Sequence, residues 1–129
     1  MSAADLSTAT VGQLLIPVTQ LERAIAFYRD TLGLPFLFAA PPQMAFFQAG
    51  PVRLLVGVRE DGQADARSQM VYFKVPDITA TFDTLAARGV SFPAPPHLVH
   101  RAPTYELWLC AFDDPDGNPL CLMCERPVA

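Results

Sequence analysis

A strand-helix pattern occurs twice in this chain, and this repeat limits the possible folds more than any other feature of the sequence. Residues 11–18 form a β-branched, apolar segment suited to a strand, and residues 19–33 follow with the spacing of an amphipathic helix. Residues 70–75 and 77–89 repeat that order. Moving the first copy forward by 57 positions superimposes the apolar faces of the two helices. The repeat predicts a βαβββ unit that is present twice.

The ends of both helices are marked by residues with known terminal preferences. Thr19 and Glu22 have the Thr-x-x-Glu spacing of a capping box, in which each side chain binds a free backbone N–H. Asp77 is expected to cap the second helix, while Gly33 and Gly89 are expected to end the two helices in the left-handed conformation. The expected apolar faces comprise Leu21, Ile25, Tyr28 and Leu32 in the first helix and Ile78, Phe82 and Leu85 in the second.

Short apolar segments separated by Pro and Gly complete each unit. The expected strands are residues 35–38, 44–50 and 51–58 in the first unit, and 90–92, 97–101, 105–112 and 120–124 in the second. We therefore expect an α+β fold in a single domain over residues 1–129, with one module at about 10–59 and the other at about 69–126. The loop 60–68 is the expected joint.

The composition excludes several classes of protein. The chain has 129 residues, of which 51% are hydrophobic and 17% charged, so a packed core is expected and disorder is not. A net charge of −4 without a basic run argues against binding to nucleic acid or to an anionic membrane. No signal peptide or membrane-spanning segment is recognisable. Three cysteines form no disulfide framework, and Cys121 and Cys124 should face opposite ways on a strand, so a reduced, cytoplasmic protein is expected.

The segment DPDGN, residues 114–118, has the composition of a tight turn. Asp and Asn side chains bind turn backbone, Pro fixes one φ angle, and Gly117 suits a position with positive φ. Asp114 and Asp116 are accordingly expected to shape a hairpin rather than to act as catalysts.

Three segments together resemble the vicinal oxygen chelate superfamily, which includes glyoxalases, bleomycin-resistance proteins and extradiol dioxygenases. They are AIAFYRDTLGLPF (24–36), YFKVPDITATFDTLAARGV (72–90) and FDDPDGNPLCL (112–122), and the resemblance covers nearly the whole chain in order. It implies two βαβββ modules whose curved, mixed sheets surround a shared cleft, commonly completed in a homodimer.

In the metal-using members of that superfamily, four positions in the cleft carry imidazole, carboxylate or amide ligands. By resemblance these positions are Gln13, Met70, Cys121 and either Leu54 or Leu55; strand alternation favours Leu55, and aligning Gly50 with Gly117 favours Leu54. One amide oxygen and two sulfur atoms do not suit Mg²⁺, Mn²⁺, Fe(II) or Zn²⁺. We therefore expect no metal and no cofactor.

Without metal ligands, the cleft is expected to be apolar with a few polar tips, as small-molecule sites commonly are. The expected lining, from resemblance and from strand alternation, comprises Gln13, Leu15, Arg53, Leu55, Met70, Tyr72, His97, Tyr105, Leu107, Leu109, Cys121 and Met123. Aromatic faces could stack on a planar ligand, and Arg53 could meet a carboxylate or phosphate. The alternative is a cleft filled by its own side chains.

Two functions remain open at this level. The first is metal-free binding of a small apolar or aromatic molecule, of the bleomycin-resistance type. The second is an enzyme, a lyase, isomerase or dioxygenase, that uses a metal or relies on His97, Tyr105 or Cys121 for proton transfer or attack. His97 and His100 lie three residues apart, so in an extended segment they should face opposite ways and not chelate together.

Overall fold

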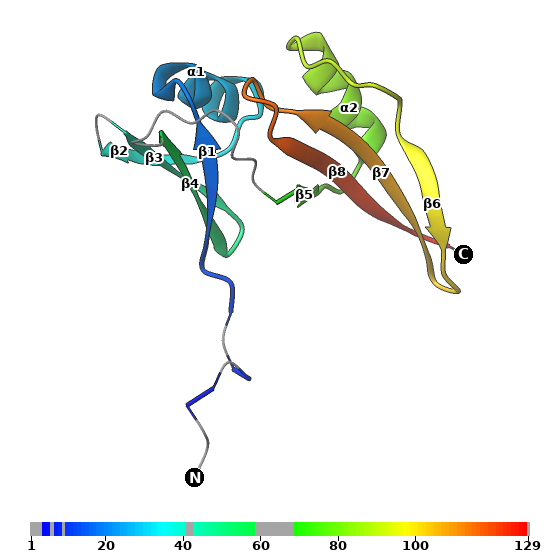
Figure 1. Ribbon diagram of the computed structural model, residues 1–129. Coiled ribbons are helices and arrows are strands. Elements are labelled where there is room, and N and C mark those ends of the chain that lie inside the picture. The colour runs from blue at the N-terminus through cyan, green and yellow to red at the C-terminus, as the bar shows by residue number, and fades with distance from the viewer. Residues whose placement is uncertain (1–3, 6, 9, 41–42, 59–68, 129) are drawn as a thin grey trace.

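The computed structural model describes residues 4–5, 7–8, 10–40, 43–58 and 69–128, and it contains two βαβββ modules (Figure 1). The expected joint, residues 60–68, lies outside the described residues. Each module forms its own four-stranded sheet, and both helices lie on the same side of the pair of sheets, as Figure 1 shows. The α+β fold and the duplication predicted from the repeat are confirmed.

The first module begins with strand β1 (Gln13–Val18) and helix α1 (Leu21–Ile25), which continues as the π-helical segment η1 (Ala26–Thr31). Strands β2 (Phe36–Ala40), β3 (Met44–Ala49) and β4 (Val52–Val58) follow. The sheet order is β1-β4-β3-β2, with β1 parallel to β4 and the other pairs antiparallel.

The second module repeats this arrangement with strand β5 (Val71–Lys74), helix α2 (Ile78–Ala87) and strands β6 (His97–Arg101), β7 (Tyr105–Asp113) and β8 (Pro119–Pro127). Its order is β5-β8-β7-β6, and β5 is again parallel to its neighbour. Strands β1 and β5 therefore lie at equivalent edges of the two sheets.

The two helices differ in how they begin. The side chain of Asp77 accepts a hydrogen bond from the Ala80 N–H at 3.0 Å, so the predicted cap of α2 is confirmed. The predicted capping box of α1 is wrong, because Gln20 occupies the N-cap without a side-chain bond and the Thr19 hydroxyl donates to Asp116 instead. Gly33 and Gly89 have φ angles of 79° and 97°, as expected for glycines that end a helix.

Residues 90–92, which were expected to form a strand, form none. Val90 is buried and Phe92 packs against the rings of Phe82 and Phe112, so the apolar pattern reflects burial in the core. The prolines at positions 93, 95 and 96 cannot donate the hydrogen bonds of a ladder, which begins only at His97.

The hydrophobic core lies between the helices and the faces of the sheets that they cover. Its largest fully buried members come from both modules and include Tyr28, Phe47, Leu54, Ile78 and Phe112. Within the described part of the chain, no helix is long and apolar enough to cross a membrane.

A buried carboxylate joins the two modules. Asp114, in the turn between β7 and β8, accepts a hydrogen bond at 2.8 Å from the hydroxyl of Tyr28 in η1. The other Asp114 oxygen accepts from the backbone N–H groups of Asp116 and Asn118, both at 2.8 Å. Burial and the nearby Asp114 charge raise the pKa of Tyr28, so its hydroxyl remains a donor at neutral pH.

The same turn makes further contacts with the first module. The Asn118 amide donates to the carbonyl of Pro17 at the end of β1, at 2.8 Å. Asp116 accepts hydrogen bonds from Thr19 and forms an ion pair with Arg23 of α1 at 2.9 Å. The DPDGN turn thus shapes its hairpin, as predicted, and also docks that hairpin on the start of the first helix.

We expect replacement of Tyr28 by Phe to lower the free energy of unfolding by about 1–2 kcal/mol, because a buried carboxylate oxygen loses its hydroxyl donor. The matched control is Tyr105→Phe, since the Tyr105 hydroxyl has no hydrogen bond within the described residues and its loss should change stability by less than about 0.5 kcal/mol. Urea unfolding of both variants measures the difference. Equal stabilities would show that the contact between Tyr28 and Asp114 does not stabilise the fold.

Candidate ligand-binding site

Each sheet has an open face, which we define as the face turned away from α1 and α2. On the first sheet, register pairs Gln13 with Arg53 and Leu15 with Leu55, so these four side chains share one face. Phe46 joins them through its pairing with Leu55. Leu15 is 59% exposed, so this face is apolar and accessible.

The strand register places Leu54 and Leu55 on opposite faces of the first sheet. Leu54 is only 1% exposed and pairs with Phe47 in the core, whereas Leu55 lies on the open face beside Leu15. The alternation argument, which favoured Leu55, therefore describes this strand correctly, and the alignment of Gly50 with Gly117 does not.

Arg53 is held in a defined position on the open face. Its Nε donates to the side-chain oxygen of Gln13 at 3.0 Å, and its guanidinium carbon lies 5.6 Å from the centre of the Phe46 ring. Phe46 in turn stacks on Phe38, with ring centres 4.5 Å apart and planes inclined by 27°. The strand pattern gave no reason to include Phe38, because a shift of register between Phe36 and Phe38 turns it onto this face.

The open face of the second sheet carries most of the remaining predicted residues. Tyr72 pairs with Cys121, while Met123 lies opposite Leu109. Further residues on this face are Leu107 and Tyr105 of β7. Tyr72 is 50% exposed, and Met70, which precedes β5, is 39% exposed. Side chains therefore do not fill this face completely within the described part of the chain.

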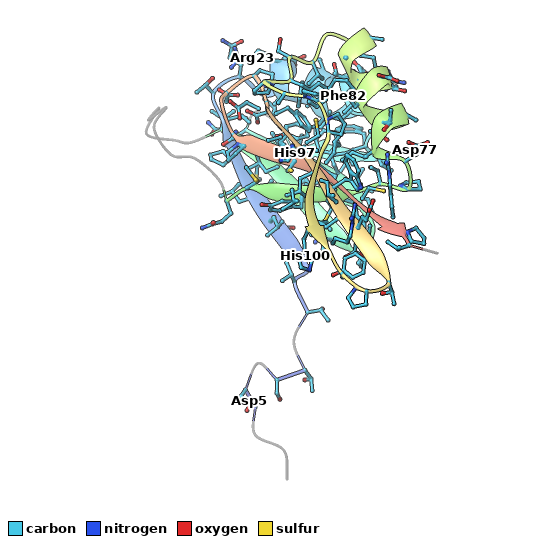
Figure 2. The ribbon with its side chains drawn as sticks, turned by 90° about the vertical axis from the view of Figure 1, so that its right-hand side faces the viewer. Asp5, Arg23, Asp77, Phe82, His97 and His100 are labelled. Atoms are coloured by element: carbon cyan, nitrogen blue, oxygen red, sulfur yellow. The ribbon has the colours of Figure 1, made fainter. Side chains whose placement is uncertain are left out.

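His97 and His100 lie on the same face, contrary to the expectation from an extended segment. His97 pairs with Leu109 and His100 with Leu107, because the register shifts by one residue between Leu98 and His100. Such a bulge adds a residue to one strand and restores the same orientation after three positions. Figure 2 shows the two histidines following one another along β6, where both are exposed.

Cys121 is poorly suited to nucleophilic attack. Its side chain is 2% exposed although it lies outside the hydrophobic core cluster, and its Sγ donates to the Leu122 carbonyl at 3.3 Å. Burial raises the pKa of this thiol, which lowers the fraction of reactive thiolate at neutral pH. Cys110, Cys121 and Cys124 are all free thiols.

The four positions compared with metal ligands do not suit a metal ion. Gln13 is engaged with Arg53, Leu55 has no donor atom, and the thiol of Cys121 resists deprotonation. Gln13 and Leu55 belong to one sheet, whereas Cys121 belongs to the other. Among the described residues, no group of three His, Cys, Asp or Glu side chains is arranged to hold a metal.

A cavity of about 440 Å³ lies elsewhere, at the junction of the modules. It is bounded by the end of η1, the β3–β4 turn, strand β5 and helix α2, and of the predicted site residues only Tyr72 lines it. Leu34 and Leu85 contribute apolar walls from the two modules. The sequence carried no signal for this cavity, because its walls come from segments that are distant along the chain.

Comparison with known proteins agrees with this geometry. A family model described as "Glyoxalase/Bleomycin resistance protein/Dioxygenase superfamily" matches residues 10–122. The uncharacterized protein YraH of Bacillus subtilis (strain 168) is 27% identical over 120 residues, which cover 82% of this chain and 91% of YraH.

Solved structures show the same fold. A member of the glyoxalase/bleomycin resistance protein/dioxygenase superfamily from Sphaerobacter thermophilus is 29% identical, with a TM-score of 0.72 over 91% of this chain and 98% of that one. A lactoylglutathione lyase from Agrobacterium tumefaciens is 25% identical, with a TM-score of 0.71 over 90% of this chain and 93% of that one.

Proposed function

This chain belongs to the glyoxalase/bleomycin resistance protein/dioxygenase superfamily, and we propose that it binds a small apolar or aromatic molecule on the open faces of its sheets without a metal ion. Such a protein breaks no bond in its ligand. It lowers the concentration of free ligand by mass action and is itself stabilised by the bound molecule.

The observation that carries this proposal is the chemistry of the four positions Gln13, Leu55, Met70 and Cys121. One amide, one hydrocarbon and two sulfur groups replace a set of oxygen and nitrogen donors, and Gln13 already accepts a hydrogen bond from Arg53. Leu55 and the exposed Met70 provide apolar surface in place of ligands, which is what a ligand pocket without a metal requires.

A lyase activity like that named for the Agrobacterium relative has less support in this chain. The raised pKa of Cys121 disfavours nucleophilic attack. His97 is exposed, and no hydrogen bond orients its ring within the described residues. In a nucleophile–base pair, the base is typically oriented by a third group.

Two Leu→Gln variants test where the ligand binds. Leu15→Gln places an amide on the open face, and Leu34→Gln places the same amide in the wall of the junction cavity. With cinnamamide, a neutral planar aromatic probe, Leu15→Gln should weaken binding on the order of tenfold, since burial of one leucine side chain contributes about 1.5–3 kcal/mol. Leu34→Gln should change the affinity less than twofold, as measured by calorimetric titration.

The reverse pattern would place the ligand in the junction cavity and overturn the assignment to the open faces. Failure of the wild-type protein to bind neutral or charged planar aromatic probes would overturn the proposed function itself. Thermal unfolding of both variants without a ligand verifies that each remains folded.

We further propose that two copies of the chain form a homodimer that encloses these faces. Strands β1 and β5 each end a sheet, so one edge of each has no partner strand within the described residues. Large apolar side chains close to these edges are exposed: Val11, Leu15, Met70 and Tyr72. Unpaired edges combined with apolar surface are typical of a protein interface.

Light scattering during size exclusion tests the dimer. The predicted mass is twice the chain mass of 14.1 kDa. A species with the mass of one chain that persists at high protein concentration would contradict this proposal, and the ligand would then have to bind to a single subunit.

A further inference from the structure

We infer that the open face of the first sheet selects planar aromatic molecules that carry a carboxylate, with Arg53 as the residue that binds the anion. This inference rests on the proposed function and adds the chemical class of the ligand. Three features of the structure support it: the uncompensated charge of Arg53, the way its guanidinium group is positioned, and the aromatic pair beside it.

Arg53 has no acidic partner within the residues that the structure describes. Three other arginines of the described chain pair with carboxylates: Arg23 with Asp116, Arg29 with Asp30, and Arg101 with Glu106, all within 2.9 Å. Two more, Arg88 and Arg126, donate to neutral oxygens of Thr31 and Thr79 instead, away from the open faces. Lys74, the cation on the open face of the second sheet, pairs with Glu125 at 2.8 Å. Arg53 instead binds the neutral amide of Gln13, and no ion pair involves it among the described residues.

Gln13 orients the guanidinium group without occupying all of it. The hydrogen bond uses Nε, at 3.0 Å, so in the described part of the chain the two terminal nitrogens retain their N–H groups for another acceptor. The two terminal nitrogens of a guanidinium group can donate two parallel hydrogen bonds to one carboxylate. This geometry is specific for planar anions. Arg53 is exposed, so an anion can reach it.

An aromatic surface lies next to this anion site. The Phe46 ring lies 5.6 Å below the guanidinium carbon, and Phe38 stacks on Phe46 with ring centres 4.5 Å apart. Phe38 is 48% exposed, which leaves ring surface for a ligand. A ligand ring that is coplanar with its carboxylate can contact this aromatic pair while the carboxylate binds the guanidinium group.

The uncharged side chains around Arg53 strengthen the selection of a ligand that carries a negative charge. The direct cross-strand neighbours of Arg53 are the neutral amides Gln13 and Gln48, and Leu15 and Leu55 lie two residues further along their strands. A ligand that covers Arg53 excludes water from the ion pair and so strengthens it. A neutral ligand of the same shape would leave the Arg53 charge desolvated without a partner. We therefore expect the charge of the ligand, rather than its apolar area alone, to determine affinity.

The experiment compares cinnamate with cinnamamide, two planar molecules of similar shape that differ in charge. In calorimetric titrations at low salt, wild-type protein should bind cinnamate at least about tenfold more tightly than cinnamamide, as expected for a charge-assisted bidentate contact. Arg53→Gln should reduce this ratio to about one. Phenyl phosphate provides the comparison with a non-planar anion.

Arg126→Gln is the matched control. Arg126 also lies over an aromatic ring, 4.6 Å from the centre of Trp108, but it binds Thr79 of α2 on the covered side of the second sheet. This variant removes the same charge and should retain the preference for cinnamate.

The outcomes separate this inference from the proposed function. Equal affinity of the wild type for cinnamate and cinnamamide would overturn the inference and leave the proposed function in place. If Arg126→Gln also lost the preference for cinnamate, the preference would come from the net charge of the protein and not from Arg53. If phenyl phosphate bound more tightly than cinnamate, the site would not be selective for a carboxylate. Either result would overturn the inference. Absence of binding by both cinnamate and cinnamamide would overturn both proposals.

Discussion

The buried carboxylate of Asp114 is the interaction on which the rest of the structure depends. It accepts hydrogen bonds from the Tyr28 hydroxyl, from the Asn118 amide and from two backbone N–H groups of its own turn. A carboxylate that is 5% exposed would be costly without such partners. Because the donors come from both modules, the hairpin of one module and the first helix of the other hold each other in place.

The opposite side of the molecule carries the faces of the two sheets that the helices do not cover. With both helices on one side, the core forms there from residues such as Ile16, Phe47 and Leu122, and the other face of each sheet remains open. In the described part of the chain the open faces carry mainly hydrocarbon and sulfur, with a few polar groups such as Gln13 and Tyr72, and the guanidinium group of Arg53. Under the proposed function, such a surface holds a ligand by burial of apolar area and by one strong polar contact at Arg53.

Alternation along strands and the duplicated pattern predicted the module architecture, the caps at Asp77, Gly33 and Gly89, and the orientation of Leu55. These features depend on local geometry, which neighbouring residues encode. The register shifts in β2 and β6 were not predictable, although they decide the positions of Phe38 and His100. A bulge adds one residue to a strand without a composition of its own, so the alternation count fails beyond it.

Long-range contacts explain the other differences. Thr19 has the sequence of a helix cap, yet its hydroxyl donates to Asp116, which lies 97 positions further along the chain. Residues 90–92 have the composition of a strand, yet they form none: Val90 is buried in the core and Phe92 packs against Phe112 from another strand. The junction cavity likewise exists only because both modules contribute walls to it. A local pattern indicates what a segment can form, and its partners determine what it does form.

The central claim is that the open faces hold their ligand without a metal ion. Elemental analysis of the purified protein by mass spectrometry, combined with ligand titration before and after treatment with a chelator, tests this claim most directly. The account predicts far less than one transition-metal ion per chain and the same dissociation constant in both titrations. One bound metal ion per chain, together with loss of ligand binding when it is removed, would contradict the account.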